Sequence, residues 1–145
     1  MTRALFPAHV RTLDDAIAFL PRWAEMIGGE LVSGIETDEL VGAGGALSVV
    51  RVRPFRVLFH SSATELTVRL VFSAELEPFG YSIDLRRDTG ALLWRHDCHE
   101  GHEHEHGGPW HLHIGPDENH RVWSEPMTLA SIADKVVATH INLTG

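Results

Sequence analysis

Histidines are concentrated in one stretch of this sequence, from Arg95 to His120. The chain has 11 histidines, and eight of them lie between His96 and His120. A neutral imidazole is the commonest protein ligand of transition metals, and its pKa near neutrality also suits proton transfer. This stretch is therefore where we expect the chemistry of the protein to lie.

Two of these histidines have a spacing that suits a shared site. His111 and His113 alternate with the apolar Trp110, Leu112 and Ile114, a pattern that predicts a strand. Residues two apart on a strand point to the same side, with their Cα atoms about 7 Å apart. Such a pair can bind one metal ion together with a third ligand and a water molecule. Without a metal, one imidazole can act as a base and the other as an acid.

Arg95 and Asp97 come where a predicted strand enters the histidine-rich loop. An arginine can stabilise charge on a phosphoryl group, and an aspartate can orient a histidine. We therefore predict a catalytic set of Arg95, Asp97, His111 and His113 that acts on a phosphodiester. The pattern leaves open whether such an enzyme is ribonuclease-like or a metal-dependent hydrolase.

The loop histidines favour a second function, transition-metal binding. They alternate with glutamates, and flexible histidine-rich tracts bind zinc, nickel or copper. The protein would then be a metal-dependent hydrolase, a sensor or a store, with zinc or another divalent transition metal as its cofactor. The candidate ligands are His99, His102, His104, His106, His111 and His113.

The elements that must position these residues are two helices and a sheet. Apolar residues recur at helical spacing after Thr12 and again after Thr128, and alternating patterns predict strands between them. The predicted fold is α+β, with a single antiparallel sheet and an N-terminal and a C-terminal helix packed on one face. We expect one domain, 1–145, with a helical part at 1–29, the sheet at 46–124, its histidine-rich loop at 96–109, and the second helix at 128–141.

Strand alternation also predicts what the uncovered face of the sheet carries. If the helices cover the apolar face, arginines and histidines gather on the other one. The apolar parity changes at Pro54, which indicates a bulge or an edge, and the acidic and glycine-rich segment 36–45 is expected to be an exposed loop. The residues expected on the uncovered face are Arg51, Arg53, Arg69, Arg86, His111 and His113.

Composition limits the classes of partner. The net charge of −8 argues against loose binding to nucleic acid, unless the arginine face supplies a local positive field. No apolar run approaches the roughly 20 residues that span a bilayer, and the N-terminus lacks a secretory signal. We expect a cytoplasmic protein without membrane association. A sheet edge near Pro54 allows a third function, a non-catalytic interaction module that forms a homo-oligomer or binds a partner protein.

One combination of motifs resembles the TumE-like toxin family of toxin–antitoxin systems. It comprises the strand Tyr81-Ser-Ile-Asp-Leu, the strand Ala91-Leu-Leu-Trp-Arg-His-Asp, a histidine-bearing loop, and His111-Leu-His113. The family shows a tyrosine-bearing strand, an Arg-Tyr-Asp-Asn element, and a later histidine cluster before a terminal helix. The resemblance covers residues 64 to 141, the C-terminal half of the chain.

Arg95 and Asp97 correspond to the arginine and aspartate of that element, and His111 and His113 fall near the later cluster. The chain departs from the pattern at His96 and Cys98, which stand for the tyrosine and asparagine, and in the inserted segment 101–106. The resemblance implies a small toxin that acts on RNA or a nucleotide-bearing substrate, and an antitoxin protein as its partner.

Overall fold

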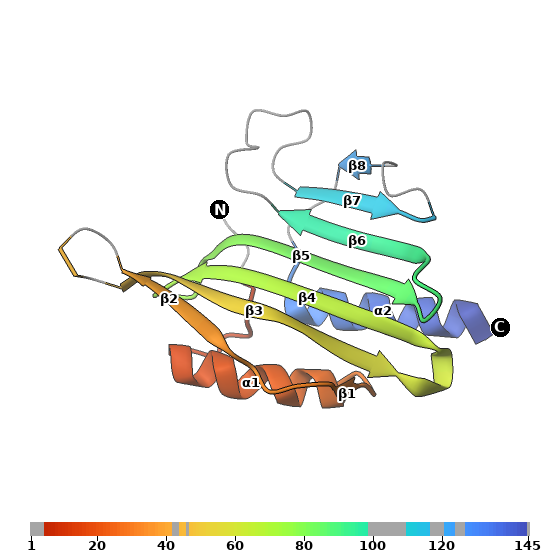
Figure 1. Cartoon of the computed structure of the whole chain (residues 1–145), viewed down its shortest axis with the longest axis horizontal. Coiled ribbons are helices and arrows are strands. Elements are labelled where there is room, and N and C mark those ends of the chain that lie inside the picture. Colours follow the sequence, from red (N-terminus) through yellow and green to blue (C-terminus); the bar gives the residue numbers. More distant parts are fainter. Residues whose placement is uncertain are drawn as a thin grey trace.

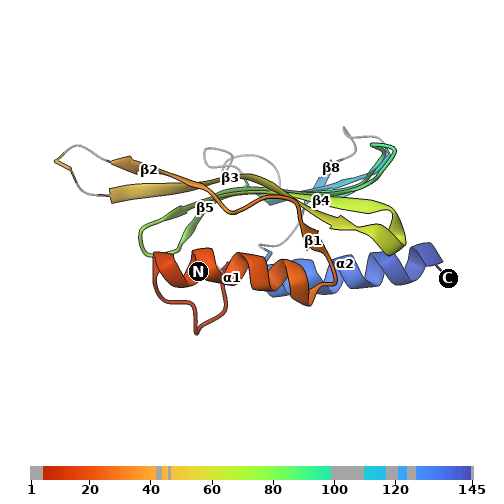
Figure 2. The ribbon, with the colours of Figure 1, turned by 60° about the horizontal axis from the view of Figure 1, so that its bottom comes forward.

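The computed structural model describes residues 5–41, 44–45, 47–98, 110–116, 121–123 and 127–144. In this part of the chain, eight strands form one antiparallel sheet, and two helices lie on one side of it (Figures 1 and 2). The predicted α+β fold is therefore confirmed. The elements are α1 (Leu13–Met26), β1 (Glu30–Leu31), β2 (Thr37–Val41), β3 (Leu47–Phe59), β4 (Thr64–Ser73), β5 (Pro78–Arg87), β6 (Leu92–Cys98), β7 (Trp110–Ile114), β8 (Arg121–Trp123) and α2 (Leu129–Thr144).

The sheet order follows the chain closely. Its path is β1-β3-β4-β5-β6-β7-β8, and β2 also pairs with β3. From β3 onward each strand thus pairs with the next along the chain (Figure 1). This meander places β6 and β7, which carry the predicted catalytic set, beside each other.

Helix α1 begins as its sequence predicts. The Thr12 hydroxyl accepts a hydrogen bond from Asp15 N, and the Asp15 carboxylate accepts one from Thr12 N, which completes a capping box. The helix continues through Pro21, at the cost of the hydrogen bond that a proline nitrogen cannot donate. It ends at Met26, and Gly28 then adopts a φ of 83° that favours glycine.

The core lies between the helices and the sheet. Leu20 and Trp23 of α1 and Ile132 of α2 are buried there against the apolar side chains of the sheet. The Trp23 indole Nε1 donates to Leu129 O over 2.9 Å, so the C-terminal half of α1 is tied to the start of α2. Neither α1 nor α2, the two helices of the described residues, combines the length and the apolar character that crossing a bilayer requires.

The N-terminal side of the sheet begins earlier than predicted. The change of parity at Pro54 is present as a shift in the β3–β4 register between Val52 and Phe55. The segment 36–45 is not only a loop, because it contains β2, paired antiparallel with β3. Alternation did not reveal β2 because none of its side chains is buried. Its partners are instead ionic: Asp38 contacts both Arg51 and Arg53, at 3.2 and 3.1 Å.

The C-terminal elements are longer than predicted. Strand β6 continues to Cys98, so residues 96–98 belong to the strand rather than to the histidine-rich loop. Helix α2 extends to Thr144, beyond the predicted end at 141. The extension of β6 matters for the site, because it places Asp97 on a hydrogen-bonded strand next to β7.

Candidate functional site

The register between β6 and β7 brings the predicted catalytic residues together. Arg95 lies opposite His113, and Asp97 lies opposite His111. We refer to these four residues as the Arg–Asp–His cluster. Asp97, His111 and His113 are 5%, 4% and 9% exposed, so they are buried although they lie on the sheet face away from the helices. We had expected this face to be open.

Direct contacts join three members of the cluster through one carboxylate oxygen. Asp97 Oδ2 accepts a hydrogen bond from Arg95 Nε over 3.0 Å, and His113 Nε2 lies 3.0 Å from the same oxygen. A carboxylate oxygen accepts, so this contact places the imidazole hydrogen on Nε2. Nδ1 is then the acceptor nitrogen of the ring. Arg95 Nη2 lies 3.3 Å from Nδ1 and 3.4 Å from Nε2, so the guanidinium group faces both ring nitrogens.

Contacts on the helix side of β6 hold the strand in place, and with it Arg95 and Asp97. Trp94, His96 and Cys98 alternate with Arg95 and Asp97 and are buried on the helix side. The Trp94 indole Nε1 donates to Thr139 Oγ1 of α2 over 3.0 Å. Contacts with α2 therefore fix one face of β6, and the alternation of the strand directs Arg95 and Asp97 to the opposite face.

His96 is a structural histidine of this strand. Its ring packs edge-on against Trp94, with the centroids 5.6 Å apart. Burial lowers its pKa to about 4, and the positive charge of Lys135 acts in the same direction. The imidazole is therefore neutral near pH 7, and it does not add charge to the buried helix side of β6.

Strand β5 adds a carboxylate that the sequence analysis did not assign to the site. Asp84 lies opposite Arg95 in the β5–β6 register and is 5% exposed. Its Oδ2 lies 3.6 Å from Arg86 Nε. Burial raises the pKa of Asp84, whereas the charges of Arg86, Arg69 and Arg95 oppose that rise. Strand alternation in the sequence does indicate this position, because Asp84 alternates with apolar residues and thus shares the face of Arg95.

The metal-binding prediction finds no support in the described part of the chain. No group of three or more histidine, cysteine, aspartate or glutamate side chains is arranged there to hold a metal ion. The Arg95 guanidinium, which contacts both Asp97 and His113, also places a positive charge where a cation would bind. The candidate ligands His99, His102, His104 and His106 lie outside the described residues, so their part in the metal site stays a prediction.

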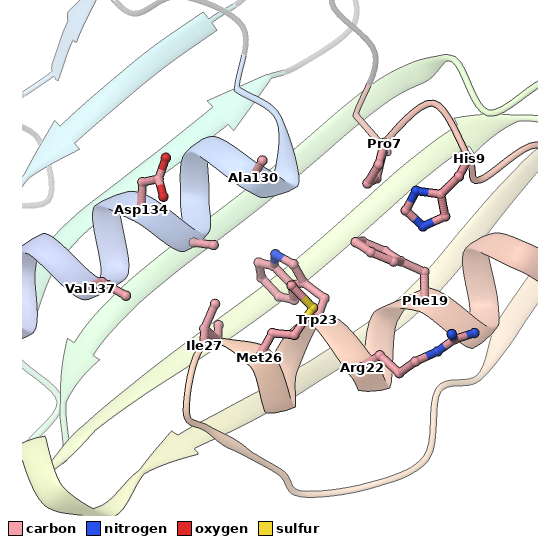
Figure 3. A pocket seen from close by; sticks show the side chains of 11 residues that line it. Pro7, His9, Phe19, Arg22, Trp23, Met26, Ile27, Ala130, Asp134 and Val137 are labelled. Atoms are coloured by element: carbon pink, nitrogen blue, oxygen red, sulfur yellow. The ribbon is translucent and has the colours of Figure 1, made fainter.

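A groove of about 470 Å³ lies elsewhere, between α1 and α2 (Figure 3). Trp23, Met26 and Val137 contribute to a mostly apolar lining, and Arg22 and Asp134 are among its few charged residues. No member of the Arg–Asp–His cluster lines this groove, and the helices that form it cover the opposite face of the sheet (Figure 2). The groove is therefore separate from the predicted chemistry.

Comparison with known families gave a match over most of the chain. The family model described as "Toxin TumE" matches residues 36–141, which is most of the chain. The match begins at the edge of β2 and runs into α2, so it contains all four residues of the cluster, whereas α1 and β1 precede it. Neither the curated proteins nor the solved structures gave a match.

Proposed function

Because this chain belongs to the TumE toxin family, we propose that it is the toxin of a toxin–antitoxin pair and acts on RNA or another phosphodiester through the Arg–Asp–His cluster. One observation carries the proposal: a single buried oxygen, Asp97 Oδ2, contacts both the guanidinium of Arg95 and the imidazole of His113. A cation for a phosphoryl group and a group for proton transfer are thus held side by side.

The tautomer of His113 suits it to act as the base. With the hydrogen of Nε2 directed at Asp97, Nδ1 carries the lone pair of the ring, and Arg95 Nη2 lies 3.3 Å from Nδ1 and 3.4 Å from Nε2. A phosphoryl oxygen that takes the Nη2 hydrogen bond would lie next to Nδ1. Nδ1 can then accept the proton of the attacking hydroxyl while Arg95 stabilises the negative charge that develops on the phosphoryl oxygens.

His111 completes the proposed reaction as the acid. It lies opposite Asp97 on β7, two residues from His113 on the same strand. Cleavage breaks the bond between phosphorus and the leaving oxygen, and that oxygen requires a proton. In this scheme a protonated His111 supplies that proton. Afterwards His113 gives up the proton it accepted to water, and His111 takes one up from water, so that both imidazoles return to their starting states.

Two substitutions test the proposal, each with a matched control. We expect His113→Ala and Arg95→Ala to abolish growth arrest on expression and to slow cleavage of RNA by the purified protein by about a hundredfold or more. His60→Ala and Arg87→Ala remove a histidine and an arginine outside the cluster, and we expect both to retain activity. His60 is an exposed residue that contacts Glu30.

The outcome that contradicts the proposal is equally specific. Growth arrest that persists in both cluster variants, or a parent protein that neither arrests growth nor cleaves RNA, would refute it. Melting temperatures of all four variants are measured alongside, so that loss of folding is not taken for loss of chemistry. The partner is tested by co-expression of a neighbouring gene, which we expect to relieve the arrest if it encodes the antitoxin.

A further inference from the structure

Three arginines surround the buried carboxylate of Asp84, next to the cluster. Arg69 lies on β4, Arg86 on β5 with Asp84, and Arg95 on β6. The charges of all three act on the Asp84 carboxyl group, and Arg86 Nε lies 3.6 Å from its Oδ2. We call Arg69, Arg86 and Arg95 the arginine trio. Only Arg95 belongs to the proposed reaction site.

The strand registers place the trio on the sheet face that carries the cluster. Arg69 lies opposite Ser82, and Ser82 lies opposite Asp97. Neighbouring strands are about 4.8 Å apart, so the Cα of Arg69 is about 10 Å from that of Asp97. Arg86 is two residues from Asp84, the cross-strand partner of Arg95, and lies just beyond a shift in the β5–β6 register between Leu85 and Arg86. Long side chains can bridge these separations.

Burial divides this region into two layers. Asp84 and Asp97 are each 5% exposed, whereas the side chains of Arg86 and Arg95 are 27% and 23% exposed and Arg69 is exposed. The acids therefore lie underneath, and the guanidinium groups reach solvent. A ligand that approaches this face meets positive charge first.

The balance of charge sets this region apart from the rest of the sheet. The arginine trio and two aspartates leave an excess of one positive charge here, because Glu65, which lies opposite Arg86, is itself paired with Arg56. The whole chain, by contrast, carries −8, and the ion pairs towards β2 join two arginines, Arg51 and Arg53, to two acids, Asp38 and Glu36. A local positive field within an acidic protein favours an anionic ligand at this place.

We propose that Arg69 and Arg86, held over the buried Asp84, form an anion subsite for a second phosphate, so that the substrate is a polynucleotide strand rather than a mononucleotide. This inference rests on the proposed function, which places the reacting phosphate at Arg95. A strand that binds there and continues across β5 towards β4 brings its next phosphate to Arg86 and Arg69. The planar guanidinium group is well suited to two-pronged contact with phosphate oxygens.

Binding of a labelled single-stranded RNA, followed by fluorescence anisotropy, tests the subsite. A His113→Ala background prevents cleavage of the probe in the proposed mechanism. We expect Arg69→Gln and Arg86→Gln each to weaken binding about tenfold and to reduce the slope of log affinity against log salt by about 0.7–0.9. Arg87→Gln is the matched control, and we expect less than a twofold change. Arg87 pairs with Thr64, whose hydroxyl contacts His140 of α2, and so lies on the helix side.

A second measurement separates the subsite from the reaction site. A dinucleoside monophosphate has a single phosphate, so in the otherwise unaltered protein Arg69→Gln and Arg86→Gln should slow its cleavage much less than they slow cleavage of a longer RNA. Equal losses on this short substrate would assign the two arginines to the reacting phosphate and overturn the inference. Arg86 also donates a hydrogen bond to Gly90 O, so melting temperatures are measured alongside the comparison. Arg69→Gln leaves that hydrogen bond in place.

The failure of the subsite and the failure of the proposed function give different results. If RNA affinity and salt slope match the parent in both glutamine variants while Arg95→Ala weakens binding, the subsite is refuted and the reaction site stands. If the parent chain does not bind the RNA at all, both are refuted.

Discussion

His96 is a buried histidine whose protonation should set much of the acid sensitivity of the fold. It is 3% exposed and lies between Ile83 of β5 and Leu112 of β7 in the sheet register. Lys135 is the charged group that faces this region from α2, with its Nζ 5.4 Å from the Trp94 ring. Burial and this positive charge lower the pKa of His96 from 6.5 to about 4.

The direction of the effect on stability follows from that shift. A histidine whose pKa is lowered by folding binds its proton more readily in the unfolded chain. His96 therefore costs no stability above about pH 7, and it favours unfolding increasingly as the pH falls from 6.5 through 4. With about 1.4 kcal/mol per pKa unit, the full cost is about 3 kcal/mol below pH 4, and about 2 kcal/mol is already present near pH 5.

The substitution His96→Leu removes the titrating group and keeps an apolar side chain of similar size. We expect the free energy of unfolding in urea, measured at about pH 7.5 and about pH 5, to fall less for this variant than for the parent, by about 2 kcal/mol. His60→Leu is the control, because the His60 side chain is 70% exposed, and we expect its pH dependence to match the parent within about 0.5 kcal/mol.

An identical loss of stability in His96→Leu and in the parent would refute this reasoning. It would mean that His96 is already hydrated or protonated in the folded protein. The comparison between variant and parent is required because other histidines titrate in the same range. His140 is one of them, since burial lowers its pKa as well.

Two further predictions concern the stability of the sheet, at Tyr81 of β5 and at Gly115 after β7. The Tyr81 hydroxyl accepts a hydrogen bond from Met127 N over 3.0 Å, and burial raises the pKa of Tyr81 to about 12. We expect Tyr81→Phe to lower the free energy of unfolding by about 1 kcal/mol, because this hydrogen bond is lost. An unchanged free energy in urea denaturation would contradict this. A Cβ on Gly115 would clash with Leu92 O, so Gly115→Ala should lower the free energy of unfolding by more than about 2 kcal/mol in the same measurement. A variant as stable as the parent would show that β7 can shift without penalty.

The features that could be predicted from the sequence are those that depend on neighbouring residues alone. Thr12 and Asp15 form the capping box that starts α1, and the parity change at Pro54 corresponds to a real shift in register. Alternation along β6 and β7 was sufficient to place Arg95 and His113 on one face. These features depend on a few neighbouring residues, so one sequence is enough to predict them.

Features that depend on contacts between distant segments were not predicted. Strand β2 pairs with β3 along the backbone and through ion pairs of Asp38 with arginines of β3, and an exposed, acidic strand gives no apolar alternation. Alternation along β5 places Asp84 on the face of Arg95, but its burial beneath the arginine trio depends on the β4–β5–β6 registers. The burial of His111 and His113 on the polar face likewise has no signal in strand periodicity.

The most direct test of the central claim is a proton–nitrogen correlation spectrum of the histidine side chains, recorded as an uncleavable dinucleoside phosphonate is added. We predict that the imidazole signals of His111 and His113 shift together and saturably, with His113 retaining its hydrogen on Nε2 in the free protein. The signals of His60 and His9 should stay in place. Shifts at His9, which lines the groove between the helices, without any at His113 would contradict the account.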